Sequence, residues 1–321
     1  MTPIQNPNPS PTKTLVMGTR GSALALVQAR QFALQLEFFH PNLRVEERII
    51  RTTGDKNQGA PLPQIGGKGV FTLEIEAALL SGEIDFAVHS LKDLPPAMPD
   101  GLCLACVPPR ESPADCLILS PALGENEGFK GELSQLPFGA KVGTSSLRRR
   151  AMLLHLRPDL KIEDVRGNID TRLSKLQSED FAAIVLARAG IARLGVEGVR
   201  AHSLPESYFV PAPGQGALAI QARTDDLDTR AILLALQDEE TRSAVEAERA
   251  VVAYLNAGCS TPLGAIARAY GDTVSLHTAV LSPDGRQRVA VSVQGVGAPE
   301  IIGGRAARSL VERGALELLG S

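Results

Sequence analysis

The sequence lacks a long apolar run and a strong excess of charge. None of its apolar stretches approaches the roughly 20 residues that a membrane-spanning helix needs. Its start, MTPIQNPNPSPTKT, has neither the charged beginning nor the apolar centre of a signal peptide. The net charge of −3 argues against a general nucleic-acid-binding protein. These absences predict a cytoplasmic protein with no membrane or nucleic-acid partner, and residues 1–14 as a disordered tail.

Motifs for a metal ion or a nucleotide are also missing. Histidine and cysteine do not cluster with the spacing of metal ligands, so no metal site is predicted. The Gly-rich stretch of residues 51–71 contains GGKG but continues with Val70, where a phosphate-binding loop would need a hydroxyl group. Because this stretch is too long for a tight turn, we expect it to be a mobile lid.

Only four cysteines are present, and the sequence favours a structural role for three of them. Cys103 and Cys106 lie in the apolar run LCLACV, which is typical of a buried strand, and their odd spacing predicts that they point to opposite faces. Cys116 lies in a similar run. Cys259 follows a long predicted helix and precedes Pro262, on a loop where a thiol could be either buried or exposed.

The chain of 321 residues is long enough for two or three domains. Residues 14–36 and 140–156 each have the pattern strand, Gly-Thr turn and helix, and Ser22 is the expected N-cap of the first helix. An Asp-Phe-Ala strand follows each of the two segments. This repetition predicts an α/β fold with two similar lobes. The chain is expected to cross between the lobes twice, over residues 107–115 and 208–223, and these two crossovers would form a hinge. The expected boundaries are residues 15–110 with 208–225 for lobe 1, 111–207 for lobe 2, and 226–321 for a C-terminal domain.

The C-terminal domain is predicted to be a small α+β unit that carries Cys259. A helix over residues 241–258 precedes the cysteine, and three alternating apolar segments follow it. The sequence SPDG, residues 282–285, predicts a hairpin turn between the last two of these strands. A final helix is expected over residues 304–319, on one side of the sheet.

Basic residues recur at the predicted strand-to-helix turns. Arginine outnumbers lysine by 25 to 8, and its planar fork fits carboxylates and phosphates. We expect Arg20, Arg148 and Arg149 to be exposed at the carboxyl ends of strands, where α/β proteins bind ligands. Cations at helix N-termini oppose the helix dipole, so their repetition indicates a polyanionic ligand. The other cations with this placement are Lys68, Lys92, Arg166 and Arg172.

Asp93 is the one carboxylate that the sequence places at a comparable strand end, beside Lys92 and before Pro95. Two roles remain open for it. It can cap the loop through an Asx turn, or it can stabilise a cation and shuttle a proton inside an anion-binding cleft. His89 lies in the same segment but has no serine and acid partners in triad order, so we expect it to be structural.

Seven motifs, in order along the chain, resemble those of the hydroxymethylbilane synthases, also called porphobilinogen deaminases. They are GTRGSALAL, GGKGVF, AVHSLKDLP, VGTSSLRRR, VRGNIDTRLSKL, APGQGALAI and GCSTPLGA. The resemblance implies two periplasmic-binding-protein-like lobes plus a third domain, in a monomer. It also implies a transferase that condenses four porphobilinogen molecules head to tail with loss of ammonia. Hydrolysis then releases the linear tetrapyrrole hydroxymethylbilane.

The resemblance also implies roles for individual residues. A dipyrromethane cofactor would be bound covalently through a thioether to Cys259, and Asp93 would be the catalytic carboxylate. Residues implied to bind the cofactor are Arg20, Ser22, Lys92, Arg148, Arg149 and Arg166. Residues implied to bind the substrate are Arg20, Gln28, Lys68, Phe71 and Arg172. Ala23 stands where the family often has proline, and we expect little functional effect from this difference.

A different class of protein is compatible with the lobes alone. A two-lobed solute-binding or effector-sensing protein would capture a carboxylate without chemistry. The third domain with Cys259 and the lack of a secretion signal or DNA-binding segment oppose this alternative. A covalent adduct on Cys259, visible in the intact mass, would distinguish the two hypotheses.

Overall fold

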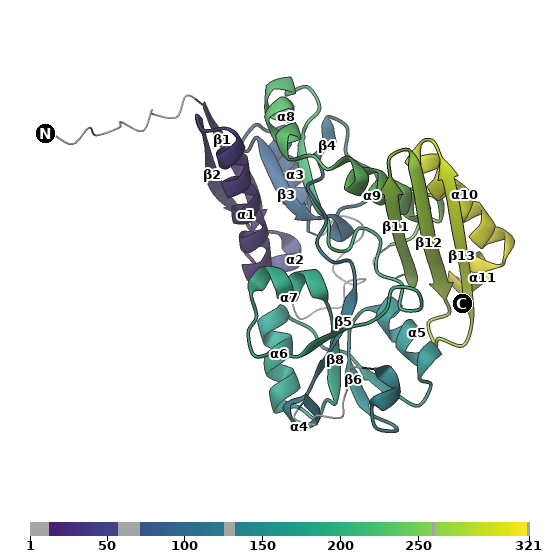
Figure 1. The fold of residues 1–321 in the computed structure, drawn as a ribbon. Coiled ribbons are helices and arrows are strands. Elements are labelled where there is room, and N and C mark those ends of the chain that lie inside the picture. The colour runs from purple at the N-terminus through teal and green to yellow at the C-terminus, as the bar shows by residue number, and fades with distance from the viewer. Residues whose placement is uncertain (1–12, 57–70, 125–131, 259–260, 320–321) are drawn as a thin grey trace, which may run out of the picture.

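The computed structural model describes residues 13–56, 71–124, 132–258 and 261–319. These residues form two five-stranded sheets and one three-stranded sheet, with helices packed against them (Figure 1). The expected mixed α/β architecture with two lobes and a smaller third unit is confirmed. Within the described ranges, no helix is long and apolar enough to cross a membrane.

The first sheet combines four strands from the start of the chain with one from much later. Its order is β2-β1-β3-β10-β4, in which β1, β2 and β3 are parallel and β10 is antiparallel to both of its neighbours. The strands are β1 (Lys13–Arg20), β2 (Leu43–Ile50), β3 (Phe86–Ser90), β4 (Leu102–Cys106) and β10 (Leu218–Arg223). Strand β1 begins at Lys13, inside the segment expected to be a tail.

The second sheet repeats the first. Its order is β7-β6-β8-β5-β9, with β6, β7 and β8 parallel and β5 antiparallel to β8 and β9. The strands are β5 (Asp115–Leu119), β6 (Lys141–Gly143), β7 (Lys161–Glu163), β8 (Ala183–Ala187) and β9 (Ala201–Ser203). The repeat read from the sequence is therefore present in three dimensions. Each crossover supplies the antiparallel strand of the sheet that it enters, β5 for the second sheet and β10 for the first.

Helices follow most strands of the two five-stranded sheets. They are α1 (Ala23–Phe39), α2 (Thr53–Lys56), α3 (Leu73–Leu80), α4 (Pro121–Gly124), α5 (Leu147–Leu156), α6 (Ile169–Ser178), α7 (Arg188–Leu194) and α8 (Leu227–Leu233). The hydroxyl of Ser22 accepts a hydrogen bond from the Ala25 amide at 3.3 Å, which confirms the predicted cap of α1. Ser146 caps α5 in the same way, through the Arg149 amide at 3.4 Å. Serine is favoured here because its oxygen satisfies an amide that has no partner within the helix.

The third sheet is the expected antiparallel unit, with β11 (Leu263–Tyr270), β12 (Thr273–Leu281) and β13 (Arg288–Val296). The predicted hairpin turn at residues 282–285 joins β12 to β13. Helix α9 (Glu239–Tyr254) packs against the sheet together with α10 (Pro299–Glu312) and the short α11 (Ala315–Leu319). The single final helix expected over residues 304–319 is wrong, because Gly314 adopts a left-handed conformation with φ of 85° and separates α10 from α11.

The third unit packs against both lobes (Figure 1). Its Ile266 and Leu281 belong to the same apolar core as Leu117 and Met152 of the second lobe. Towards the first lobe, Val245 of α9 is buried together with Leu91. Because the third unit shares buried apolar surface with both neighbours, its position is fixed relative to each of them.

The cysteines of β4 show a local error in the strand prediction. A bulge in the pairing of β10 with β4 lies between Ile220 and Gln221. An extra residue on one strand reverses the alternation of side chains beyond it. Cys103 and Cys106 therefore pack against the same apolar cluster, and their expected placement on opposite faces is wrong. Cys106 is buried, and burial raises the pKa of its thiol to about 12, which fits a structural cysteine.

Glu248 of α9 is a fully buried carboxylate that connects the hinge to the third unit. It accepts hydrogen bonds from Arg110 in the first crossover at 2.6 and 3.1 Å. It also accepts from the Gly214 amide in the second crossover at 2.6 Å and from the Ala267 amide of β11 at 2.8 Å. One side chain thus fixes both crossovers and the third sheet.

Replacement of Glu248 by glutamine should destabilise the protein strongly. The Arg110 guanidinium would lose its buried counter-charge, and the new amide group would face other donors. We expect a loss of ~3–5 kcal/mol in the free energy of unfolding, measured by urea denaturation. Glu246→Gln is the matched control, since Glu246 lies on the same helix in a partly exposed pair with Arg242, and it should cost less than ~1 kcal/mol. Equal losses for the two variants would contradict this assignment.

Candidate active site

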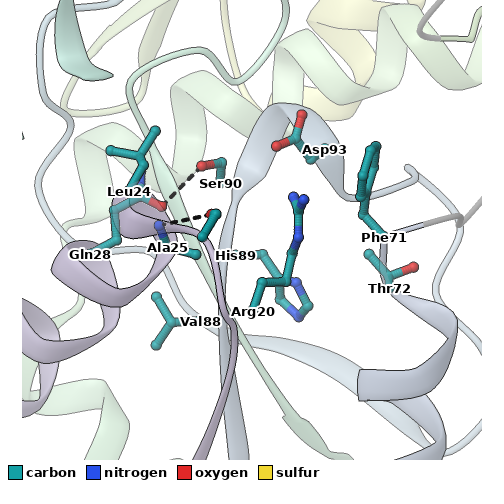
Figure 2. Close-up of a pocket in the computed structure, with 11 residues that line it drawn as sticks. Arg20, Leu24, Ala25, Gln28, Phe71, Thr72, Val88, His89, Ser90 and Asp93 are labelled. Atoms are coloured by element: carbon teal, nitrogen blue, oxygen red, sulfur yellow. Dashed lines mark hydrogen bonds between the residues drawn. The ribbon is translucent and has the colours of Figure 1, made fainter. Parts of the chain in front are cut away.

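A pocket lies in the first lobe, where β1 and β3 end and α1 begins (Figure 2). Carboxyl ends of parallel strands are a common place for ligand sites, because the loops there are free to carry functional side chains. Five of the predicted site residues line this pocket. They are Arg20, Ser22, Gln28, Phe71 and Asp93.

Arg20 is the last residue of β1, and its guanidinium lies over the ring of Phe71, with 4.2 Å from Cζ to the ring centroid. The Phe71 ring packs in turn on Gly54, where a Cβ atom would collide with it. Figure 2 shows the Arg20 side chain extending between Phe71 and Asp93. The cation–π contact holds the guanidinium in the pocket, and the planar arrangement of its N–H donors suits a carboxylate.

Gln28 and Ser22 bring polar groups of α1 to the pocket. Gln28 is buried, and its Oε1 accepts a hydrogen bond from the Ser90 hydroxyl at 3.1 Å. Ser22 accepts the capping hydrogen bond of α1, so its hydroxyl hydrogen can still be donated. Both side chains therefore have a fixed position at one side of the pocket.

Asp93 ends a 3₁₀ turn, Leu91–Asp93, that directly follows β3. The turn is fixed by the hydrogen bond from the Leu91 amide to the Ala217 carbonyl and by that from the Leu94 amide to the Leu91 carbonyl, both 3.0 Å. Within the described ranges the Asp93 carboxylate accepts no backbone hydrogen bond, so the geometry does not match the Asx-turn alternative. The carboxylate faces the pocket (Figure 2).

His89 lies beneath the pocket and is part of a buried chain of polar side chains. Its Nε2 is 3.0 Å from Oε1 of Gln221, whose amide nitrogen donates to Glu76 at 3.3 Å. Burial lowers the pKa of His89 to about 4, although the hydrogen bond with Gln221 opposes the shift. The imidazole is consequently neutral near pH 7 and adds no charge to the pocket.

In the second lobe, Arg148 and Arg149 share one carboxylate, that of Asp115. Arg148 donates to Asp115 at 2.7 Å and to the Val210 carbonyl at 2.8 Å. Arg149 donates through Nε to Asp115 at 2.9 Å and through Nη1 to the Val185 carbonyl at 3.0 Å. The two arginines are only 4% and 6% exposed, so the expectation that they are exposed is wrong. The buried carboxylate explains why they can leave the surface.

Asp115 and Gln215 contact the predicted site cations, and no pattern in the sequence singled them out. Gln215 donates to Asp115 at 3.0 Å, and its Oε1 is 3.5 Å from both Lys92 Nζ and Arg149 Nη2. Burial alone would raise the pKa of Asp115, but the charges of Arg148 and Arg149 outweigh it and bring the pKa to about 2. Gln215 thereby links two groups: Lys92, in the turn that carries Asp93, and the Asp115–Arg149 pair of the second lobe. The nearest signal in the sequence was the Gly-rich motif APGQGALAI, which contains Gln215.

Arg166 and Arg172 lie at the turn between β7 and α6. Arg166 is about one-third exposed and pairs with Asp164 at 3.1 Å. Arg172 donates to the Gly167 carbonyl at 2.9 Å, and its pKa falls to about 10 through burial and through the positive charge of Arg149. Neither residue lines the pocket of the first lobe. Lys68, most of the predicted lid and Cys259 lie outside the described residues.

Two family profiles match nearly the whole chain. The profile "Porphobilinogen deaminase, dipyromethane cofactor binding domain" matches residues 15–231, and "Porphobilinogen deaminase, C-terminal domain" matches residues 243–312. The chain belongs to the porphobilinogen deaminase family. Membership gives the protein its activity, the condensation of four porphobilinogen molecules into hydroxymethylbilane on a dipyrromethane cofactor. The non-catalytic alternative is therefore not favoured.

This chain is similar to individual porphobilinogen deaminases along almost their full length. Those of Macrococcus caseolyticus and Rubrobacter xylanophilus are 42% and 46% identical over 308 and 306 residues, covering 96% and 95% of this chain and 97% and 96% of the relatives. The enzyme of Sorangium cellulosum is 49% identical over 272 residues, covering 84% of this chain and 88% of its own.

Two solved structures show a lower similarity to this chain. The BenM effector binding domain with its effector benzoate is 15% identical, covers 70% of this chain and 94% of its own, and has a TM-score of 0.39. Full-length CbnR in complex with its target DNA is 12% identical, covers 70% of this chain and 67% of its own, and has a TM-score of 0.43.

The charges near the pocket fit a cofactor that carries carboxylates. Burial lowers the pKa values of Lys92 and Arg172, and the positive charge of Arg149 lowers both of them further. Cations that disfavour one another in this way are stabilised when an anionic ligand lies between them. Cys259, the predicted attachment point of the dipyrromethane, follows α9 and lies outside the described residues.

The Lys92 ammonium should set an alkaline limit to activity. Burial lowers its pKa to about 8, although the charge of Asp93 opposes the shift. The protonated form attracts carboxylates, so kcat/KM for porphobilinogen should fall as the pH rises through about 8. In Lys92→Arg the cation stays charged, and the fall should move up by more than about one pH unit. The pH profile of kcat/KM, with Lys141→Arg as a control outside the site, measures this shift, and identical profiles for the wild type and Lys92→Arg would reject it.

Proposed function

We propose that Asp93 is the catalytic carboxylate of this porphobilinogen deaminase and that the surrounding cations bind the carboxylates of substrate and cofactor. The observation that carries the proposal is the pocket itself. It places the Asp93 carboxylate beside the Arg20 guanidinium and the polar groups of α1, at the carboxyl ends of β1 and β3. An acid group and a carboxylate-binding group thus share one small site.

Arg20 and Lys92 orient the substrate in this proposal. Porphobilinogen carries an acetate and a propionate group, and a guanidinium held in place over Phe71 can bind one carboxylate through two parallel hydrogen bonds. Gln28 and Ser22 add neutral hydrogen-bonding groups on the opposite side of the pocket. Binding by the carboxylates leaves the aminomethyl group free to face Asp93, which is the geometry that the loss of ammonia requires.

Asp93 acts on the charge that develops when ammonia leaves porphobilinogen. As the carbon–nitrogen bond breaks, positive charge spreads over the pyrrole ring and its N–H group, and an adjacent carboxylate lowers the energy of that charge. The same carboxylate can pass a proton to or from the substrate nitrogen. When bound through Cys259, the dipyrromethane supplies the pyrrole carbon to which the growing chain is attached.

Arg148, Arg149, Arg166 and Arg172 are proposed to hold carboxylates on the side of the second lobe. Arg148 and Arg149 together carry two positive charges against the single carboxylate of Asp115, so this buried group keeps a net positive charge. Arg172 adds to it, as the influence of Arg149 on its pKa shows. Lys68 is proposed to complete the site from the lid.

We also propose the finer features of organisation that the resemblance implies. The protein would act as a cytoplasmic monomer, without nucleic-acid or membrane partners. Its domains would be residues 15–110 with 208–225, residues 111–207, and residues 226–321. The net charge of −3 supports the absence of a nucleic-acid partner, and the sheet membership of the strands supports the domain bounds.

Intact mass tests the covalent cofactor directly. Protein purified from cells that make porphobilinogen should exceed its sequence mass by one dipyrromethane. Cys259→Ser should lose this addition and all turnover, because no thioether can form at that position. Cys103→Ser is the matched control, since Cys103 packs against an apolar cluster, and it should keep the added mass. A folded wild-type protein without the added mass would contradict the assignment of the cofactor to Cys259.

Asp93→Asn tests the catalytic carboxylate. The amide keeps the shape of the side chain but carries no charge, so kcat for hydroxymethylbilane formation should fall by ~10²–10⁴-fold. The intact mass should still show the cofactor wherever loading survives. Asp100→Asn is the control, because Asp100 is exposed on the loop beyond the site. Near-normal product formation by Asp93→Asn would reject the role.

A further inference from the structure

Arg249 of α9 binds the backbone that follows Asp93. Its Nη1 donates to the Leu94 carbonyl at 3.2 Å, and its Nη2 donates to the carbonyls of Pro95 and Pro96 at 2.9 and 3.0 Å. The guanidinium therefore spans three consecutive peptide carbonyls, and the first of them belongs to the residue directly after Asp93.

Arg249 is half-buried, and its hydrogen-bond partners among the described residues are carbonyl groups. Burial lowers its pKa to about 10, although the charge of Glu246 opposes the shift. Glu246 itself pairs with Arg242 at 2.8 Å, and no carboxylate of the described chain lies within ion-pair distance of Arg249. A guanidinium in such a place is stabilised by carbonyl dipoles, and each of these hydrogen bonds is charge-assisted. At pH 7 it remains a cation.

The segment that Arg249 binds has few other backbone hydrogen bonds. Pro95 and Pro96 have no N–H group, so they cannot donate a backbone hydrogen bond. The Leu94 amide closes the 3₁₀ turn on Leu91, and the Leu91 amide is bound by Ala217. The turn that carries Asp93 is thus fixed at its start by Ala217, the residue before β10, and at its end by Arg249.

We propose that Arg249 is a positioning residue for Asp93, a role that rests on the catalytic role proposed for that carboxylate. Arg249 sets the backbone after Asp93, and Asp93 in turn faces the pocket. The neighbouring residue of α9, Glu248, fixes both crossovers and the third sheet. Helix α9 therefore fixes the position of the Asp93 carboxylate relative to the two crossovers. The planar guanidinium is needed because a single ammonium group cannot span the three carbonyls.

Arg249→Ala and Arg249→Lys are the test variants, and Arg242→Ala is their control. Arg242 lies on the same helix and donates to a carbonyl of the first lobe, that of Leu104 at 3.2 Å, away from Asp93. The measurements are intact mass, thermal midpoint, kcat and KM of each cofactor-loaded protein. We expect kcat of Arg249→Ala to fall by ~10–100-fold, since a small displacement of a catalytic group has that effect, with KM within about threefold of the wild type. Arg249→Lys should be intermediate, and Arg242→Ala should have a normal kcat.

Guanidinium ion provides a readout that a general loss of stability would not give. Millimolar guanidinium chloride should restore part of kcat in Arg249→Ala, because the ion can occupy the vacated place and donate to the same carbonyls. It should not raise kcat in the wild type or in Arg242→Ala, and sodium chloride at equal concentration should have no effect. If Arg249→Ala does not load its cofactor, Arg249→Lys is the test variant. A lowered kcat with KM near the wild-type value supports the inference, and a normal kcat overturns it.

A double variant with Asp93→Asn separates this inference from the proposed function. If Arg249 acts through Asp93, adding Arg249→Ala to Asp93→Asn should lower kcat by less than about threefold, far less than in the wild-type background. A lower thermal midpoint with normal kcat in both Arg249 variants would overturn the inference while leaving Asp93 in place. A raised KM with unchanged kcat would also overturn it. Normal kcat in Asp93→Asn would instead reject the role of Asp93 itself.

Discussion

The rest of the structure depends on one buried carboxylate. Asp115 is the first residue of β5, at the point where the chain enters the second lobe, and it is fully buried. It compensates two adjacent arginines, each of which also donates to one carbonyl, Arg149 to a carbonyl of β8 and Arg148 to one of the second crossover. Without this carboxylate, two guanidinium groups would stand uncompensated in the interior, which is among the most costly arrangements in a protein. The start of β5, the start of α5 and the second crossover are therefore fixed together.

The same interaction determines the chemistry of the site. One carboxylate cannot neutralise two guanidinium groups, so a net positive charge remains where the lobes meet, and Lys92 and Arg172 add to it. The arginines are held in place by carbonyls and by Gln215. In the proposed function, a ligand rich in carboxylates would complete the charge balance. The proposed affinity for a polyanion would then depend on the packed hinge as well as on the pocket.

The sequence predicted the general architecture well but the burial of its arginines poorly. The two similar lobes, the third sheet, the hairpin at residues 282–285 and the cap at Ser22 all follow from local patterns, and the structure contains them. The partners of Arg148 and Arg149 could not be predicted, because Asp115 and Gln215 reach them from distant parts of the chain. The bulge in β4 and the separation of α10 from α11 at Gly314 could not be predicted for a related reason. A single inserted residue or a single left-handed glycine changes a strand face or ends a helix without altering the apolar pattern around it.

The exchange of strands between the lobes explains why hinge and site coincide. Each crossover enters the other sheet as its antiparallel strand, so the two connecting segments run side by side and Gln215 donates to both Pro113 and Asp115. Gln215 also reaches the turn that carries Asp93, because its Oε1 lies 3.5 Å from Lys92 Nζ. The connections between the lobes and the proposed site therefore share one set of buried polar groups.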